Sequence, residues 1–337
     1  MTMTPQSTLS PTPSGDAPAH NAASKAAPPG VSWPWVTAAL IAHTGWGIYP
    51  VLGRYMQTVS GLPTLSILVV GGFPMLLLML FYVIPRNGWG LFRSRQLWLL
   101  GLVVVFRSIT NLLAARFTLS IYVQLITLMT PFIVIIFSRI FLREPAPDYT
   151  GRAILFSFIG AVMMMSAGVG VAGVRLALTA SDWLGLALAF GSSVSLAFYM
   201  IIIRNTARHD LPFDAVLVFQ SVVIMASALT ISLIIGEDWS RWLDNGPMDW
   251  LVIAAYILLV VFGANGLQIG ALRHLGAPMV SSMMAWRLVS ALILGGLLLG
   301  ERLTSWWQFA GALLVLVTIT WYLWRQRETR QTDKVKG

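Results

Sequence analysis

The feature that constrains this chain most is a series of long apolar runs separated by short breaks. Between Trp33 and Trp324 the sequence holds ten runs of about 19 to 25 residues, and the breaks contain glycine, proline or charge. A helix of about 20 apolar residues crosses the hydrocarbon core of a bilayer. The runs cover residues 34–54, 64–84, 97–115, 118–142, 152–172, 183–203, 214–235, 250–270, 278–299 and 306–324. We therefore expect an all-α integral membrane protein with ten transmembrane helices.

The boundary between the third and fourth runs is the least marked, since only Arg116, Phe117 and Thr118 separate them. A nine-span arrangement would join these runs into one helix over 97–142, which is much too long for a core about 30 Å thick. The composition agrees with a membrane protein, because only 10% of the residues are charged and 57% are hydrophobic. A soluble domain carries about 25% charged residues.

Two polar tails flank the apolar region. Residues 1–31 are rich in proline, serine, threonine and alanine, which predicts a disordered tail, and they lack the features of a secretory signal peptide. Residues 325–337 form a basic tail. With the N-terminus inside, 15 of the 22 basic residues fall in inner segments and 5 in outer loops. Because cytoplasmic loops carry the excess of lysine and arginine, we expect both termini in the cytoplasm.

The chain also repeats itself weakly. A shift of 157 residues places Arg116 on Arg273 and Glu144 on Glu301, and a shift of 150 places Tyr49 on Tyr199. Both shifts divide the chain into two units of five spans, over residues 32–174 and 182–324. Since five is odd, the second unit runs through the membrane in the opposite sense. Inverted repeats are typical of secondary transporters, whose substrate site lies near the midplane between the halves.

A motif at the end of the fourth span of each unit carries a family resemblance. Residues 141–144 (Phe-Leu-Arg-Glu) lead to Gly151 in the first unit, and residues 299–304 (Leu-Gly-Glu-Arg-Leu-Thr) lead to Gly311 in the second. In these features the chain resembles the EamA-type members of the drug/metabolite transporter superfamily, over about residues 33–324. The resemblance implies two inverted five-helix repeats and a transport function. It does not imply one substrate, because such proteins move amino acids, sugars, phosphorylated metabolites, vitamins and drugs.

Two arginines stand out because they lie inside spans. All 13 acidic residues fall in tails, loops or span ends, whereas Arg107 is near the centre of the third span and Arg287 near the centre of the ninth. A charge at that depth costs about 2.5 to 3.5 kcal/mol, so each needs a cavity or a partner. A planar guanidinium suits carboxylate or phosphate, which predicts an anionic group on the substrate. The alternatives are backbone carbonyls at helix breaks, or pairing with Glu144 or Glu301.

Further polar and aromatic residues lie at compatible positions. The candidates for substrate contact besides the arginines are Asn111, Gln124, Tyr199, Asn265, Gln268 and Trp286. Asn111 follows Arg107 by four residues, so both lie on one helical face. These side chains could instead hydrogen-bond helix to helix, and the aromatic ones could form packing or interfacial belts.

His43 is a candidate for proton coupling. It lies in the first span at about the place where small multidrug members of the superfamily keep a glutamate, and histidine titrates near neutral pH. The alternative is a histidine hydrogen-bonded between helices. With no cysteine and four scattered histidines, we expect no metal site, no cofactor and no catalytic residue.

These features favour a secondary active transporter that works by alternating access. We expect it to move a small anionic or zwitterionic metabolite (an amino acid, a carboxylate or a phosphorylated compound) across a bacterial inner membrane, with export favoured over uptake and proton coupling as an option. The alternatives are a membrane enzyme acting on lipid phosphates and a channel without saturation. We expect a small-molecule substrate and membrane lipid as partners, a homodimer as a candidate assembly, and no nucleic acid, because the net charge of +9 reflects topology.

Overall fold

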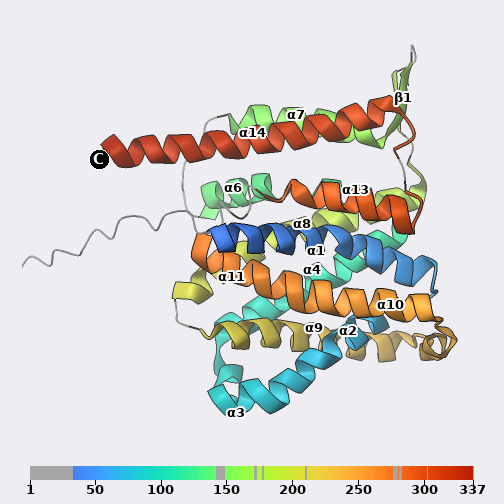
Figure 1. The fold of residues 1–337 in the computed structure, drawn as a ribbon, viewed down its shortest axis with the longest axis vertical. Helices are drawn as coiled ribbons and strands as arrows, with labels where there is room; N and C mark the ends of the chain where they lie inside the picture. The colour runs from blue at the N-terminus through green and yellow to red at the C-terminus, as the bar shows by residue number, and fades with distance from the viewer. Residues whose placement is uncertain are drawn as a thin grey trace, which may run out of the picture.

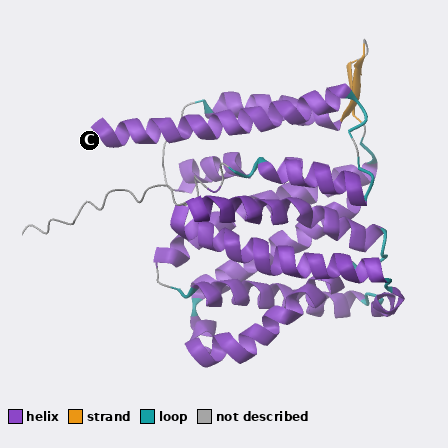
Figure 2. Ribbon diagram, viewed as in Figure 1, coloured by secondary structure: helices purple, strands orange, loops and turns teal. Residues whose placement is uncertain are grey.

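Apolar helices make up nearly all of the chain that the structure, a computed structural model, describes (Figures 1 and 2). The described residues are 33–141, 149–170, 173–176, 178–208, 211–275, 280, 283–301 and 303–336. The predicted tail over residues 1–31 lies outside them. The all-α membrane class predicted from the sequence is confirmed, with one short β-hairpin added.

The elements follow one another in two halves. The first half contains α1 (Trp33–Thr58), α2 (Thr64–Leu78), the π-helical η1 (Met79–Val83), α3 (Ile84–Asn87), η2 (Trp89–Arg93), α4 (Arg95–Phe117), α5 (Ser120–Thr127), α6 (Thr130–Phe141), α7 (Thr150–Met165), β1 (Ser166–Gly170) and β2 (Gly173–Leu176). The second half contains α8 (Ala180–Arg208), α9 (Phe213–Ile235), η3 (Trp239–Asp244), α10 (Pro247–Ala255), the π-helical η4 (Tyr256–Ala264), α11 (Asn265–Leu275), α13 (Trp286–Leu298) and α14 (Trp306–Lys336).

Several predicted runs differ from the helices observed. In the ninth run, 278–299, a turn at residues 283–285 precedes α13, which begins at Trp286, and the tenth run, 306–324, continues as α14 to Lys336. The fourth run, 118–142, is divided into α5 and α6 by a turn at Leu128 and Met129. Pro131 follows this turn in the first turn of α6, where its missing N–H is tolerated. The fifth run, 152–172, is helical only as far as Met165, because the glycine-containing segment after it pairs as β1 with β2 in an antiparallel hairpin.

Not every helix has the length and composition of a full membrane span. Five are long and apolar enough: Thr64–Asn87, Arg95–Phe117, Ala180–Ile203, Phe213–Ile235 and Pro247–Leu275. Four shorter apolar helices are Ser120–Val134, Gly151–Met164, Trp286–Leu298 and Trp306–Tyr322. The number of ten spans and the orientation of the termini therefore stay predictions.

The two halves interleave instead of standing apart. Helix α1 packs on α13 and α11, and α4 packs on α8. The two repeats align α1 with α8, α4 with α11, and α6 with α13. The α4–α8 contact therefore corresponds to the α11–α1 contact, and the α1–α13 contact corresponds to the α8–α6 contact. All four contacts occur. The repeats also align α2 with α9 and α7 with α14, and in each of these pairs the two helices contact each other. This pattern agrees with two repeats related by a pseudo-two-fold axis, and it surrounds α1 with helices of the second repeat.

Helices α7 and α14 lie side by side along one edge of the molecule, at the top of Figure 1. Their contact depends on two glycines that face each other. A Cβ atom on Gly160 would lie 2.9 Å from the carbonyl oxygen of Gly311, and a Cβ on Gly311 would lie 2.6 Å from the carbonyl oxygen of Gly160. Small residues at such positions let membrane helices approach closely.

Replacing Gly311 by leucine is therefore expected to lower the free energy of unfolding by about 1–3 kcal/mol, because backbone atoms cannot move aside as a side chain can. Thermal unfolding of the purified protein in detergent would measure the change. Gly151→Leu is the matched control, because a Cβ at that position meets nothing within 4 Å. Equal stability of the Gly311→Leu variant and the wild type would contradict the close-packed α7–α14 contact.

Candidate functional site

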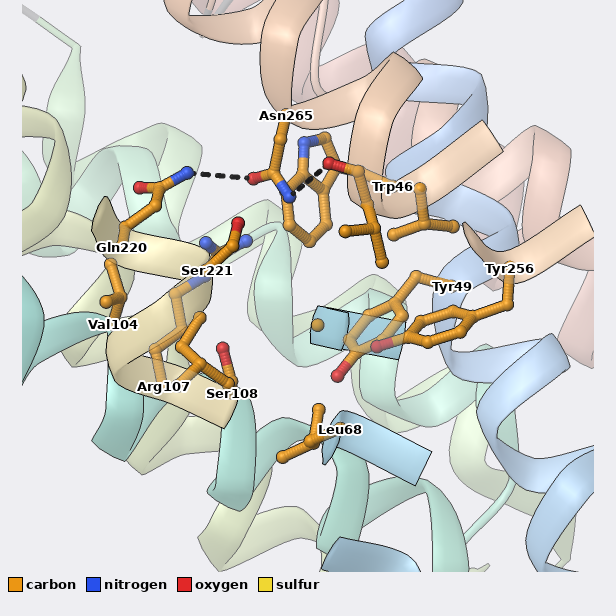
Figure 3. A pocket seen from close by; sticks show the side chains of 14 residues that line it. Trp46, Tyr49, Leu68, Val104, Arg107, Ser108, Gln220, Ser221, Tyr256 and Asn265 are labelled. Atoms are coloured by element: carbon orange, nitrogen blue, oxygen red, sulfur yellow. Dashed lines mark hydrogen bonds between the residues drawn. The ribbon is translucent and has the colours of Figure 1, made fainter. Parts of the chain in front are cut away.

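Two small cavities lie among the helices around α1, and Trp46 and Tyr49 of α1 line both of them; Figure 3 shows the first cavity. The first has a volume of about 50 Å³ and the second about 20 Å³. The first is lined by Trp46, Tyr49, Leu68, Gly72, Val104, Arg107, Ser108, Gln220, Ser221, Ile224, Tyr256, Val260, Val261 and Asn265. The second is lined by Trp46, Tyr49, Arg107, Ser108, Asn111, Gln124, Thr127, Ser192, Leu196 and Arg287. Arg107 thus faces both cavities and Arg287 faces one.

Glycines bring the helices around α1 close enough to build the site. A Cβ on Gly47 would lie 2.6 Å from the carbonyl oxygen of Arg287 on α13, and a Cβ on Gly45 would lie 2.8 Å from the carbonyl oxygen of Leu259 on η4. Neither position leaves room for a side chain. Residues 45–47 therefore set the distance between α1 and the helices of the second repeat.

Arg287 is buried and bound by neutral groups. Its side chain has an exposed fraction of 1%. Its Nε donates a hydrogen bond to Nδ1 of His43 at 2.9 Å, and its Nη2 donates to Oε1 of Gln268 at 3.2 Å. Because neither partner is a carboxylate, the charge of the guanidinium is hydrogen-bonded but not neutralised.

His43 has its tautomer fixed by these contacts. Its Nε2 lies 2.8 Å from the carbonyl oxygen of Val280, and a carbonyl can only accept, so Nε2 carries the hydrogen. Its Nδ1 accepts the hydrogen bond from Arg287, so it carries none. The ring is therefore neutral in this conformation. A second proton on Nδ1 would place two donors and two positive charges against each other.

Arg107 is held by aromatic rings. Its Cζ lies 4.3 Å from the ring centroid of Trp46 and 5.4 Å from that of Tyr199, and Cζ of Arg287 lies 5.8 Å from the Trp46 ring. Such cation–π contacts contribute up to about 2 kcal/mol at desolvated sites. Among the described residues, the ion pairs are Arg54–Glu301 and Arg241–Asp238, so neither buried arginine has a carboxylate partner there.

Of the other residues predicted to contact substrate, three line a cavity and two contact the buried arginines. Asn111 and Gln124 line the second cavity, and Asn265 lines the first. Tyr199 and Gln268 line neither of these two cavities, but they contact Arg107 and Arg287, respectively.

Trp286 points away from the two cavities. Its indole Nε1 donates to Oγ1 of Thr44 at 2.9 Å, and 45% of the residue is exposed. It neighbours Arg287 in sequence, but its side chain lies on a different face of α13.

Several lining residues were not among the predicted ones. Gln220 and Ser221 are a polar pair in the middle of the apolar helix α9, and this interruption of an apolar span is a signal that could have identified them. Tyr256 begins the π-helical segment η4, and its ring stacks on that of Tyr49 at a centroid distance of 5.9 Å. A tyrosine inside an apolar run carries no comparable sequence signal.

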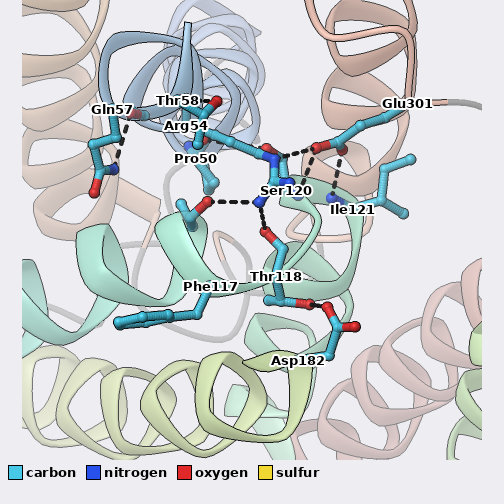
Figure 4. Close-up of polar contacts among 12 residues, drawn as sticks. Pro50, Arg54, Gln57, Thr58, Phe117, Thr118, Ser120, Ile121, Asp182 and Glu301 are labelled. Carbon is cyan, nitrogen blue, oxygen red and sulfur yellow. Dashed lines mark hydrogen bonds and ion pairs between the residues drawn. The ribbon is translucent and has the colours of Figure 1, made fainter. Parts of the chain in front are cut away.

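Glu301 serves a different network, which joins the two repeats (Figure 4). Its Oε1 lies 3.1 Å from Nε of Arg54, and its carboxylate accepts the backbone N–H groups of Ser120 and Ile121 at the start of α5. Nη1 of Arg54 also donates to the carbonyl oxygens of Ala115 and Thr118. Burial raises the pKa of the Glu301 carboxyl, while Arg54 and the two amides oppose that shift. Glu301 thus pairs with Arg54, and not with Arg107 or Arg287 as the alternative from the sequence had it.

The role of Glu144 cannot be compared in the same way, because this residue lies outside the described residues. The alternative that it pairs with one of the two arginines inside the spans therefore stays a prediction. The remaining network around Arg54 extends to Asp182 on α8, whose carboxylate accepts from Oγ1 of Thr118 at 2.7 Å.

Comparison with known proteins agrees with this architecture. A solved crystal structure described only as "Crystal structure of protein" is 18% identical, with a TM-score of 0.56, and the match covers 84% of this chain and 95% of that one. At that identity the likeness shows the fold alone. No curated protein matches significantly. The sequence model of the EamA-like transporter family matches residues 33–166 and 183–324, one match in each half. The chain therefore belongs to the EamA-like transporter family, within the drug/metabolite transporter superfamily.

Proposed function

We propose that the protein is a secondary transporter that carries a small anionic or zwitterionic metabolite by alternating access, as an exporter in a bacterial inner membrane. The observation that carries this proposal is the position of Arg107. Its guanidinium is buried between Trp46 and Tyr199 at the wall shared by both cavities, without a carboxylate partner among the described residues. An uncompensated charge in a membrane interior is costly, so an anionic ligand is the partner that the site lacks.

The size of the cavities supports a carrier that must change conformation. A single bound water needs a cavity volume of about 10–15 Å³. The first cavity, of about 50 Å³, and the second, of about 20 Å³, therefore hold a few waters and no metabolite. Substrate can bind only when the helices around α1 separate. Motion of one repeat against the other around a central site is the mechanism that inverted repeats provide.

Transport by purified protein in proteoliposomes tests this proposal against its alternatives. We expect saturable uptake of an organic anion and counterflow, in which a preloaded unlabelled anion drives entry of the labelled one. Flux that rises linearly without counterflow would favour a channel. Release of phosphate from a lipid phosphate would favour a membrane enzyme, although members of this family are generally not enzymes.

His43 offers a route for proton coupling within the same proposal. A proton can bind to Nδ1 only when Arg287 no longer donates to that atom. An anion that draws Arg287 away would free Nδ1, so binding of the anion and of the proton would favour each other.

The variant His43→Gln separates the two roles, because an amide can accept from Arg287 and donate to Val280 but does not titrate. We expect this variant to retain counterflow and to lose accumulation driven by a pH gradient. The control is His274→Gln, since the exposed His274 stacks on Trp35 away from the cavities. Accumulation by His43→Gln against the substrate gradient would show that the proton binds elsewhere.

A further inference from the structure

The orientation of three amide side chains around the cavities follows from backbone carbonyls. Gln124 donates from Nε2 to the carbonyl oxygens of Trp46 at 2.7 Å and Gly47 at 3.3 Å. Because carbonyls only accept, the NH₂ group of Gln124 must point toward them. Its Oε1 is then a buried acceptor, and it has no hydrogen-bond partner.

The same reasoning fixes Gln220 through its neighbour Asn265. Nδ2 of Asn265 donates to the carbonyl oxygen of Val261 at 3.2 Å, so Oδ1 of Asn265 is the atom that accepts from Nε2 of Gln220 at 3.3 Å (Figure 3). Oε1 of Gln220 is therefore an acceptor, and it too lacks a partner. It belongs to a side chain that lines the first cavity.

Asn111 is oriented by the hydroxyl of Ser192. That hydroxyl donates its hydrogen to the carbonyl oxygen of Arg107 at 3.1 Å, so it can only accept from Nδ2 of Asn111 at 3.2 Å. Oδ1 of Asn111 is thus a third acceptor without a partner. Leaving a buried acceptor unpaired costs about 1–3 kcal/mol, so three around one site indicate that donors arrive from outside the protein.

The charge of the site decides which kind of donor fits. Arg107 and Arg287 both lie near Trp46, and no carboxylate lines either cavity among the described residues. An ammonium group would add a further positive charge beside two guanidinium groups, and only neutral amide oxygens would face it. A hydroxyl group donates the same hydrogen bond without that charge.

From these orientations and charges we infer that the transported anion is hydroxylated: a carboxylate or phosphate whose remaining part donates hydrogen bonds through hydroxyl groups to Gln124, Gln220 and Asn111. This inference rests on the proposed transport of an anion. It narrows the range of substrates, because it excludes anions with purely apolar chains and disfavours amino acids.

Ligand pairs that differ only in the donor test the inference. The carboxylate probes are propanoate, lactate, glycerate and alanine at three carbons, with hexanoate and gluconate at six. The phosphate probes are propyl phosphate and glycerol 3-phosphate. Each is measured as a competitor of counterflow and by thermal shift. We expect each hydroxyl that reaches an acceptor to tighten the apparent affinity about fivefold or more.

Glutamine variants locate the effect. Gln220→Met and Gln124→Met keep the side-chain length but remove the acceptor together with the NH₂ donor, so we expect both anions to bind more weakly and the preference for the hydroxylated member to fall about fivefold. Gln57→Met is the matched control. Gln57 is also buried, but its amide is fully paired with Gly53, Leu112 and Thr64 and lines neither cavity.

The outcomes separate this inference from the proposed function. Equal affinities for the hydroxylated and deoxy anions, or tighter binding of alanine than of lactate, would overturn the hydroxylated-substrate inference and leave anion transport standing. Unchanged preferences in both glutamine variants would mean that the acceptors bind internal water only, and would overturn it too. If no anion binds, and if the Arg107→Gln variant transports at the same rate as the wild type, the proposed function itself is overturned.

Discussion

Replacing Arg107 by glutamine is expected to lower transport at subsaturating substrate by a factor of about 30 to several thousand. Truncating one partner of a buried charge pair costs about 2–5 kcal/mol, and each 1.4 kcal/mol corresponds to a factor of ten. Arg107 qualifies because it is 7% exposed, lies against Trp46 and Tyr199, and faces both cavities. The variant loses its only formal charge at that position, whereas the rings that surround it remain.

Arg107→Lys and a control on the same helix separate charge from geometry. Lysine keeps the charge but not the planar pair of donors, so we expect an intermediate rate. Arg116→Gln carries the same substitution at the exposed end of α4, and we expect it to transport like the wild type. Initial rates in proteoliposomes, normalised to the amount of folded protein, provide the measurement. A wild-type rate for Arg107→Gln would contradict a role of this side chain in binding the anion.

The two arginines show how much of the site could be predicted from the sequence. A charged residue in the middle of an apolar run can be located by counting along the run, and Arg107 and Arg287 indeed lie buried around the central cavities. Their neutral partners could not be predicted in this way. Whether Arg287 contacts His43, Gln268 or a carboxylate depends on how α1, α11 and α13 are placed relative to one another, and that placement depends on contacts between distant parts of the chain.

Trp286 shows the limit of an argument from sequence neighbours. Consecutive residues on a helix point about 100° apart, so a residue next to a buried arginine more often faces another side. The rotation of α13 places Arg287 inside and Trp286 toward Thr44 with nearly half of its surface exposed. Gln220, by contrast, was identifiable in principle, because it interrupts an apolar span.

The fold could be predicted more completely than the site, because periodic apolar runs and the repeat shift depend on many residues together. The exceptions are local. The run 152–172 stays predominantly apolar beyond Met165, and hydropathy alone cannot show that the chain leaves the helix after that residue to form a hairpin. The break between α5 and α6 comes just before Pro131, but proline alone does not predict such a break, because Pro50 and Pro74 lie inside α1 and α2.

The pair Arg54–Glu301 gives the second large expected effect, on stability. Glu301→Gln is expected to lower the free energy of unfolding by about 2–5 kcal/mol, because removing one partner of a buried pair leaves the other charge uncompensated. The side chain of Glu301 is 4% exposed, and its carboxylate also accepts two backbone N–H groups at the start of α5. An amide in its place turns one acceptor into a donor against those groups or against Arg54.

A double-mutant cycle with Arg54→Gln assigns this loss to the pair. If the interaction stabilises the protein, the sum of the losses in free energy of unfolding of the two single variants exceeds the loss of the double variant. We expect this difference, the coupling energy, to be about 1 kcal/mol or more. The control is Asp238→Asn, because Asp238 pairs with Arg241 at 3.5 Å with both side chains about 60% exposed, and such pairs contribute about 0–1 kcal/mol. Unfolding in mixed detergent micelles, followed by tryptophan fluorescence, measures all variants. Strictly additive losses would show that Glu301 stabilises the chain through the α5 amides alone, and not by tying α1 of the first repeat to the α13–α14 loop of the second.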